Sequence, residues 1–493
     1  PEHLTTAEKI AEKSIVLLNN YGLLPIRKYL RSVAVIGTAA DTVYYGDYTK
    51  TRGRKGGVSV LDGIRAAVSP ETEVLYERGC NFLGQALHPF DPSMLRDENG
   101  ESGLTGHYYN GPVPQGEPVQ VRTDRTVNFN WIFALPHPAL DANCFSVVWT
   151  GSVVMPRTMD GCIGLSTQDS MRLYVDDKLL IDGWGKDKSA DQALDFHFEA
   201  GRTYKIRIEF VNDRRGARVI FGYSAGRENF PAAVEAARKA DVAILCMGDN
   251  EETSGENFDR TDLNLPGRQL ELVQAVYATG TPVVLVLQSG RPVTANWEND
   301  HLPAILEAWF PGEQGGTAIA KTLFGDAAPG GRLPITFPRS VGQIPCHYSR
   351  RPGGGKRYVE MDWLPLYPFG YGLTYTTFAY RDMALSRSVI DPQDTVTVSV
   401  TVTNTGKYTG DAVPQLYVRD MFSSVVKPER QLAAFRRLTL APGESRRVEL
   451  TVGPKQLRTL GPDYVWRVEP GKFELQLGDN AENILLRADL TVE

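Results

Sequence analysis

A polar loop at residues 248–260 (GDNEETSGENFDR) carries the densest group of side chains that could do acid–base chemistry. Its candidate carboxylates are Glu251, Glu252, Glu256 and Asp259. The loop directly follows the apolar run 241–247 (DVAILCM), which predicts a buried strand. Ligands of open α/β sheets bind at the carboxyl ends of the strands, so the loop is a candidate site. Any one carboxylate in such a loop is, however, more often simply solvated.

The elements that would position this loop alternate between strand and helix, on both sides of a different region. Apolar runs predict further buried strands at 31–41, 73–76, 282–287 and 305–309. Patterns with helical spacing lie at 5–18, 59–68, 231–240, 269–278 and 316–323. This alternation predicts a parallel sheet covered on both faces. A nucleotide-binding Rossmann fold would need a GxGxxG motif after residues 35–37, and the sequence has none, so we expect no cofactor.

Two regions show the alternating pattern of β-strands instead. The first runs from 106 to 223, and its Asp176-Asp177 pair lies between two strand-like runs and predicts a hairpin turn. The second begins near 386, with turn signals at a spacing typical of a β-sandwich. A chain of 493 residues is expected to form about three domains. We predict an α/β sandwich from 1–87 and 229–375, a β domain at 88–228, and a β-sandwich at 386–493.

Composition excludes some classes of function. The net charge is -6, which argues against a nucleic-acid partner, and no apolar stretch is long enough to predict a membrane span. The five cysteines are widely spaced, odd in number and without a CxxC motif, so the sequence predicts free thiols and no metal site. A Cys144–Cys162 bridge stays open as an alternative in a secreted protein.

Several motifs resemble those of glycoside hydrolase family 3, which includes many β-glucosidases and β-xylosidases. They are 13–20 (KSIVLLNN) with 24–25 (LP), 33–37 (VAVIG), 46–48 (GDY), 255–260 (GENFDR) with 265–269 (LPGRQ), 309–312 (WFPG), 330–334 (GGRLP) and 367–376 (YPFGYGLTYT). Their order and spacing match the second domain of that family, an α/β sandwich. Each motif alone would be weak, but together they are highly specific.

The two β regions resemble accessory domains of the same family. Residues 106–109 (GHYY), 173–177 (LYVDD) and 201–204 (GRTY) are similar to a PA14 domain, which some family 3 β-glucosidases carry at this place. Residues 404–406 (NTG), 415–418 (QLYV) and 435–438 (FRRL) resemble the family's fibronectin type III-like domain. Some PA14 lectins bind calcium and sugar through paired aspartates, which is an alternative role for Asp176 and Asp177 beside the favoured turn.

The resemblance implies a retaining exo-β-glycosidase, most nearly a β-glucosidase, whose general acid/base is Glu256. Glu252 is the alternative for this role, and Asp259 with Arg260 is expected to hold the loop. Asn257 stands where relatives often have glycine. A glutamate with a raised pKa can protonate a leaving-group oxygen near neutral pH, which is the chemistry such a role requires.

The resemblance also implies a missing partner. Retaining hydrolysis needs a second carboxylate about 5–5.5 Å from the first, as the nucleophile. In this family the nucleophile is an aspartate on an N-terminal (β/α)8 barrel, typically within Ser-Asp-Trp, and this sequence contains neither. We therefore expect the barrel on a separate chain, cleaved off or left out, and no activity without it. The expected substrate is a β-glucoside or related glycoside; the alternatives are a non-catalytic carbohydrate-binding module and a structural fragment.

Overall fold

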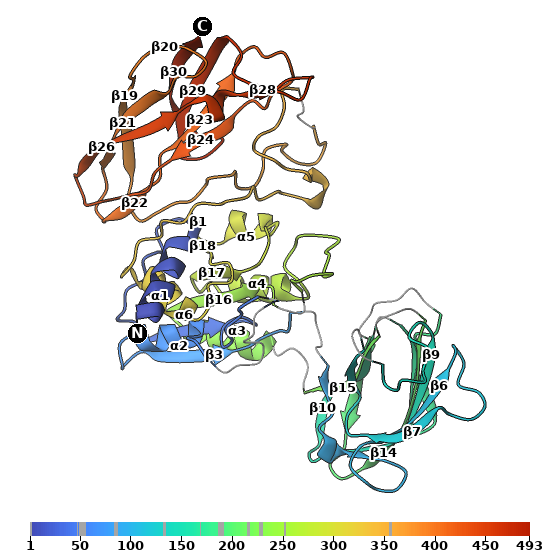
Figure 1. Cartoon of the computed structure of the whole chain (residues 1–493). Coiled ribbons are helices and arrows are strands. Elements are labelled where there is room, and N and C mark those ends of the chain that lie inside the picture. Colours follow the sequence, from blue (N-terminus) through green and yellow to red (C-terminus); the bar gives the residue numbers. More distant parts are fainter. Residues whose placement is uncertain are drawn as a thin grey trace. The chain divides into compact units, whose positions relative to one another are not determined.

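The computed structural model describes residues 2–46, 48, 56–82, 87–131, 135–167, 169–185, 192–213, 217–225, 230–250, 253–353 and 357–493. The chain forms two compact units (Figure 1). One consists of Pro1–Leu83 together with Phe230–Glu493, and the other of Gly84–Asn229. Within the described ranges, no helix is long and apolar enough to cross a membrane.

The first unit is built on a six-stranded sheet in the order β1-β18-β17-β16-β2-β3. Its strands are β1 (Val16–Asn20), β2 (Ser32–Ile36), β3 (Glu73–Glu77), β16 (Val242–Gly248), β17 (Val283–Gln288) and β18 (Ala304–Glu307). β1 runs antiparallel to β18, and every other pairing is parallel. The strands predicted around 31–37 and 241–247 lie next to each other, so chain segments before and after the second unit share one sheet.

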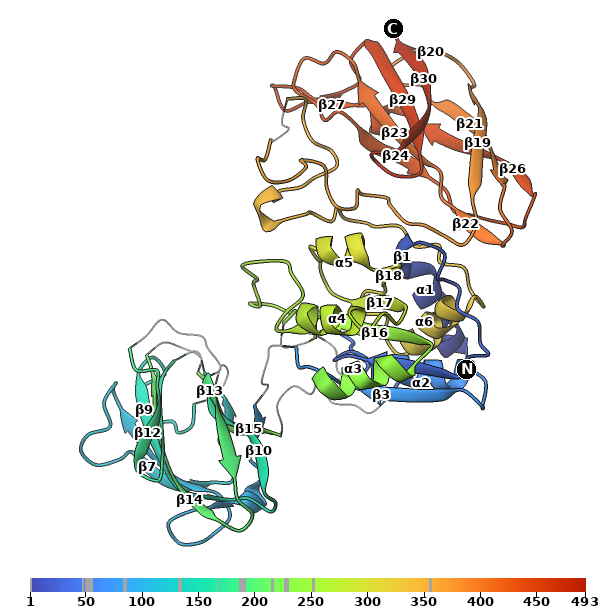
Figure 2. The same ribbon diagram turned by 180° about the vertical axis from the view of Figure 1, so that it is seen from behind.

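Helices cover both faces of this sheet (Figure 2). They are α1 (Glu2–Ser14), α2 (Val60–Ala67), α3 (Phe230–Lys239), α4 (Gln269–Tyr277), α5 (Asn296–His301) and α6 (Gly315–Phe324). Apolar side chains of α1, α2 and α6 pack on one face, and those of α3 and α4 on the other. In β2, Val33 and Val35 face the first layer while Ala34 and Ile36 face the second, as in a strand buried on both sides. The predicted α/β fold class is confirmed.

The predicted helix at 5–18 is too long at its carboxyl end. α1 ends at Ser14, and Val16, Leu17 and Leu18 belong to the edge strand β1. These three side chains are all buried, which a strand between two helix layers allows and a surface helix with one apolar face does not. Ile10, assigned to the apolar face of the helix, is 65% exposed.

The second unit consists of two antiparallel sheets around one aromatic core. One sheet has the order β13-β10-β15-β4 with β8 beside β15, and the other β12-β11-β14-β9-β6-β7 with β5 beside β9. The strands are β4 (His88–Pro89), β5 (Leu95–Arg96), β6 (Leu104–Asn110), β7 (Gln120–Asp124), β8 (Asn128–Asn130), β9 (Phe145–Val154), β10 (Met159–Thr167), β11 (Ser170–Val175), β12 (Lys178–Asp182), β13 (Gln192–Phe198), β14 (Thr203–Asn212) and β15 (Arg218–Ala225). Trp131, Trp149 and Phe210 lie in the core between them.

Asp176 and Asp177 form the turn of the β11–β12 hairpin. Their φ angles are 49° and 62°, the left-handed values that a two-residue hairpin turn requires and that aspartate tolerates. Asp176 accepts a hydrogen bond from the backbone N–H of Lys205, and its carboxylate pairs with Arg202. These contacts confirm the turn, and no cluster of potential metal ligands is found among the described residues.

The cysteines are free thiols, so no Cys144–Cys162 bridge forms. Cys80, Cys162 and Cys246 are buried, while Cys144 and Cys346 are partly exposed. Burial raises the pKa of the Cys346 thiol, which keeps it protonated near neutral pH.

The carboxyl-terminal part of the first unit is a β-sandwich, as predicted. One sheet holds β19 (Phe378–Leu385), β21 (Val396–Asn404) and β26 (Ser445–Val452), and the other β20 (Val389–Ile390), β30 (Ile484–Val492), β29 (Gly471–Gly478), β23 (Gln415–Asp420) and β24 (Gln431–Phe435). Two short ribbons join β22 (Gly410–Ala412) to β25 (Leu438–Leu440) and β27 (Thr459–Leu460) to β28 (Trp466–Arg467). Helix α7 (Pro454–Leu457) precedes β27.

A buried carboxylate fastens this sandwich to the α/β part. Asp411 of β22 is 2% exposed and accepts hydrogen bonds from Lys13 Nζ (2.6 Å), Arg437 Nη1 (3.0 Å) and Thr439 Oγ1 (2.6 Å). Arg437 also donates to the carbonyl of Gly330 in the α/β part. Burial alone would raise the pKa of Asp411, but the three donors hold it below its ordinary value.

We expect Asp411→Asn to destabilise the first unit by about 2 kcal/mol, because it removes a buried carboxylate that accepts charge-assisted hydrogen bonds from the partly exposed Lys13 and Arg437. A carboxyl pKa that is lowered by folding gives stability that is present above its ordinary value and lost as the pH falls through the folded value. The difference in the free energy of unfolding between variant and wild type should therefore become smaller below pH 4. Denaturant unfolding at pH 7 and pH 3 measures both effects.

Asp326→Asn is the matched control, because the Lys28–Asp326 pair has side chains 38% and 43% exposed. A surface pair of this kind contributes about 0–1 kcal/mol. Equal effects of the two substitutions would contradict the role assigned to Asp411.

Candidate active site

The polar loop begins where β16 ends. Gly248 has φ 139°, and a Cβ there would lie 1.9 Å from the carbonyl oxygen of Gln288, so only glycine fits. The Gln269 side chain of α4 accepts a hydrogen bond from the Gly248 N–H (2.7 Å) and donates one to its carbonyl (2.9 Å). Asp249 N–H donates to Gln288 O of β17 (2.8 Å). These bonds fix the direction in which the chain leaves the carboxyl end of the sheet.

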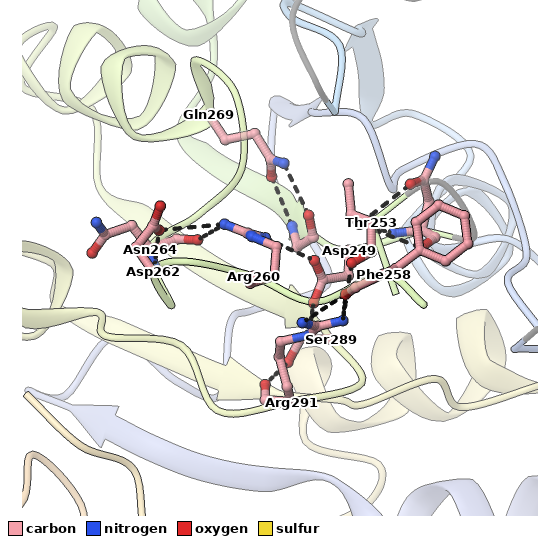
Figure 3. Close-up of polar contacts among 11 residues, drawn as sticks. Asp249, Thr253, Phe258, Arg260, Asp262, Asn264, Gln269, Ser289 and Arg291 are labelled. Carbon is pink, nitrogen blue, oxygen red and sulfur yellow. Dashed lines mark hydrogen bonds and ion pairs between the residues drawn. The ribbon is translucent and has the colours of Figure 1, made fainter. Parts of the chain in front are cut away.

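Asp249 is the buried anion at the base of the loop. It is 2% exposed and lies 3.4 Å from Arg260 Nη1 and 3.7 Å from Arg291 Nε (Figure 3). Burial raises its pKa above the ordinary value, while a hydrogen bond with Thr253 and the charges of the two arginines oppose this shift. One carboxylate thus anchors two guanidinium groups that come from different parts of the chain.

The two arginines hold the backbone of the loop in place (Figure 3). Arg291 Nη2 donates to the carbonyls of Thr253 (2.9 Å) and Phe258 (3.3 Å). Arg260 Nη2 donates to the carbonyl of Asn264 (2.9 Å). A guanidinium has several N–H donors in a fixed plane, so it can bind an anion and backbone carbonyls at once. The loop is therefore fastened on both sides of residues 254–257.

Glu256 lies at the turn of this fastened loop. The Phe258 N–H donates to Gly255 O (3.3 Å), which closes the turn, and Glu256 is exposed. Asn257 has φ 65°, a left-handed conformation that glycine adopts freely and asparagine tolerates better than most residues. Asparagine in place of the relatives' glycine is therefore compatible with the turn. The Glu256 side chain is therefore exposed on a loop whose base is held in place.

Of the other predicted carboxylates, the structure describes only Asp259. Glu251 and Glu252 lie outside the described residues. Asp259 is exposed, and within the described part of the chain no ion pair to it is found. Arg260 pairs instead with Asp249 and with Asp262 at 3.4 Å each. Arg260 holds the loop as expected, but it does so through the buried Asp249, and the described contacts give Asp259 no part in this.

A second buried carboxyl group, Glu307, lies at the end of β18. It is 0% exposed; Oε2 accepts from Ser289 Oγ (3.1 Å) and Oε1 from the Trp309 backbone N–H (2.8 Å). Trp309 has φ 58°, an uncommon backbone angle for a bulky residue. The same Ser289 hydroxyl lies 2.8 Å from the carbonyl oxygen of Arg291, so its single proton is shared between the two acceptors and connects this carboxyl group to the arginine that holds the loop. Burial raises the pKa of Glu307 to about 8.

Sequence reasoning missed these buried polar residues. Asp249 belongs to the predicted loop, but nothing in the sequence separates it from the exposed acids beside it. Ser289 and Arg291 follow β17, and Glu307 is a single acid in an otherwise apolar strand. An acid inside a strand that must be buried on both faces was the one available signal, since such a group needs a polar partner.

A raised carboxyl pKa makes the stability of the fold depend on pH. Between the ordinary value and about 8, the folded state keeps the Glu307 proton and the unfolded state loses it, so stability falls as the pH rises. The slope for one group is at most about 1.4 kcal/mol per pH unit. We expect Glu307→Gln to remove this slope. The free energy of unfolding of the variant should therefore rise relative to that of wild type from pH 5 to pH 8. Thermal unfolding across that range measures it.

Glu313→Gln is the control, because Glu313 is an exposed acid nearby in the chain. Its unfolding curve should follow wild type at every pH. Parallel curves for Glu307→Gln and wild type would show that Glu307 does not titrate in this way.

Comparison with known proteins finds two family models that match this chain. Residues 15–375 match the family model described as the glycosyl hydrolase family 3 C-terminal domain, and residues 412–481 match the fibronectin type III-like domain. A β-glucosidase of Rhizobium radiobacter is 33% identical over 528 aligned residues, which cover 100% of this chain and 63% of that protein. A β-xylosidase of Formosa agariphila is 45% identical over 302 residues, which cover 59% of this chain and 42% of that protein.

A solved structure is similar over the same extent. The β-glucosidase of Kluyveromyces marxianus in complex with glucose has a TM-score of 0.73 and 28% identity, over 100% of this chain and 63% of that one. The chain therefore spans less than two thirds of the length of each of these relatives.

Proposed function

Because the chain belongs to glycoside hydrolase family 3, we propose that it is the part of a retaining exo-β-glycosidase that supplies the general acid/base, Glu256. The observation that carries this proposal is the position of Glu256. It is exposed on a turn at the carboxyl end of a parallel sheet, and the loop around it is held by Asp249, Arg260 and Arg291. The proposed substrate is a terminal, non-reducing β-linked glucose. Two of the similar proteins are β-glucosidases, which supports this choice.

Glu256 would act twice in the reaction. In the first step its carboxyl group donates a proton to the glycosidic oxygen, so that the leaving group departs as a neutral alcohol. A carboxylate nucleophile on the other side of the sugar forms the glycosyl-enzyme at the same time. In the second step the Glu256 carboxylate accepts a proton from water, which attacks the anomeric carbon and releases the sugar.

The nucleophile would come from a (β/α)8 barrel that this sequence does not contain. The barrel belongs to the same enzyme, either as a further part of a longer chain or as a separate polypeptide. The exposure of Glu256 supports this arrangement, since an acid/base that completes a site on another domain must face outward. The buried arginine network supports it too, because a loop that meets a second domain works best when its shape is already fixed.

We further propose that residues 88–228 form a PA14-like domain inserted into an α/β sandwich of 1–87 and 229–375, and that 386–493 form the fibronectin type III-like domain. Two antiparallel sheets around an aromatic core support the first assignment. The motifs at 106–109 and 173–177 lie on β6 and on the β11 hairpin of that core.

We expect the 493-residue chain alone not to hydrolyse aryl β-glucosides, because on this proposal the nucleophile that must face Glu256 lies on the barrel. Addition of the family's barrel domain should restore activity. Release of nitrophenol from 4-nitrophenyl β-glucoside, with and without the barrel polypeptide, measures this. Turnover by the rigorously purified chain at the rate of a complete enzyme would place a nucleophile within these residues and overturn the proposal.

Glu256→Ala, tested in the enzyme with its barrel, should lose about 10²–10⁴-fold in kcat on alkyl glucosides and cello-oligosaccharides, which need a proton to depart. The loss should be much smaller on activated aryl glucosides. Azide should rescue the variant on the activated substrates, since a small anion attacks the glycosyl-enzyme without a general base. Initial rates across a series of leaving groups measure the dependence.

Three control variants separate acid/base chemistry from positioning. Asp259→Asn and Glu252→Ala should change the rates little, because neither side chain is required to transfer a proton. Asp249→Asn should slow all substrates alike without azide rescue, because it loosens the loop as a whole. A leaving-group dependence in Glu252→Ala, or none in Glu256→Ala, would move the assignment away from Glu256.

A further inference from the structure

Two adjoining hollows form a groove on the first unit, apart from the loop that carries Glu256. One, of about 360 Å³, lies in the segment between α6 and β19, and the other, of about 580 Å³, lies on the sandwich beside β27 and β28. Arg351 lines both, so the two hollows meet at this residue. Concave sites of this size with a few convergent polar groups are typical of small-molecule sites.

The groove is positively charged although the chain as a whole is negative. The hollow beside β27 is lined by Arg351, Lys427 and Arg458 and by no acidic residue among those described. Lys427 is neutralised by Asp420 at 3.2 Å. Arg351 and Arg458 are exposed, and no carboxylate partner of either is found in the described part of the chain. Two unpaired guanidinium groups at one groove favour an anionic ligand, which they can bind through paired N–H donors.

Each end of the groove carries an arginine stacked on a tryptophan. The Cζ of Arg458 lies 4.5 Å from the centre of the Trp466 ring, and that of Arg350 lies 4.5 Å from the centre of the Trp363 ring. Stacking fixes the plane of a guanidinium. The N–H edge of Arg350 is already paired with Glu429 and Glu482, whereas Arg458 has no carboxylate partner among the described residues. Trp466 is 55% exposed and Trp363 is 41% exposed, so both rings also offer apolar surface to a ligand.

We propose that this groove binds an acidic oligosaccharide, that is, a glycan whose sugar rings carry carboxylate groups. The carboxylates pair with Arg351 and Arg458, and the apolar faces of the rings pack on the exposed parts of Trp466 and Trp363. Figures 1 and 2 show the gold segment after α6 and the yellow-green loop after β16 on the same side of this unit. A glycan held in the groove would therefore lie on the side of the catalytic loop, but binding there does not depend on the catalytic assignment.

The test is a calorimetric titration of the 493-residue chain with trigalacturonate, with cellotriose as the neutral comparison. We expect trigalacturonate to bind at least about tenfold more tightly than cellotriose, and to bind more weakly as NaCl rises from 50 to 500 mM, because salt screens exposed charges. Arg351→Gln and Arg458→Gln should each weaken binding about tenfold, and Trp466→Ala should weaken it for both sugars.

Arg381→Gln is the matched control, because Arg381 is an exposed arginine of the same sandwich on β19 and lines neither hollow. It should bind trigalacturonate like wild type. All substituted residues are exposed, and thermal unfolding checks that each variant keeps its fold. Equal binding of cellotriose, no effect of the arginine variants, or no binding at millimolar concentration would each overturn the proposal. Equally tight binding of hexaglutamate would show a site for acidic peptides instead.

Discussion

The pairing of β2 with β16 is the constraint on which the rest of the first unit depends. It places Val33 opposite Val242 and Ile36 opposite Leu245, and all residues of both strands are buried. A shift of one residue would turn every side chain to the opposite helix layer, so the two apolar layers specify the register strongly. That register decides where Gly248 stands relative to Gln288 and therefore where the polar loop leaves the sheet. The position of Glu256 thus rests on hydrophobic packing between segments far apart in the sequence.

Hydrophobic packing in the sheet stabilises the fold, whereas burial of the polar residues beneath the loop destabilises it. Burial of Asp249 and Glu307 opposes folding, and the arginines and the Ser289 hydroxyl offset only part of that cost. The network connects the carboxyl ends of β16, β17 and β18 through side-chain contacts. Without these contacts the loop could change conformation at its glycines. The buried polar network at this edge therefore lowers the stability of the fold, and its contacts hold the functional loop in one geometry.

The fold was largely predictable from the sequence, and the site only in outline. Runs such as DVAILCM and PVVLVL have one plausible structure, because continuous apolar strands must be covered on both faces. The prediction of a helix over 5–18 is wrong for residues 16–18, because a short apolar run does not by itself distinguish a strand from a helix. The loop and Glu256 could be named from local motifs. The Asp249–Arg291 contact could not, since it joins residues brought together only by the parallel pairing of β16 and β17.

The inserted unit also sets the order in which the protein can be made. β3 ends at Glu77 and β16 begins at Val242, so a ribosome that adds about 5–20 residues per second needs roughly ten to thirty seconds to pass from one to the other. Throughout that interval β2 lacks β16 and leaves one apolar edge unpaired, whereas the sheets of residues 88–225 are complete as soon as β15 has been made, before β16 follows. The insert can thus fold first, and the emerging chain must keep β2 and β3 from pairing with other molecules until β16 arrives.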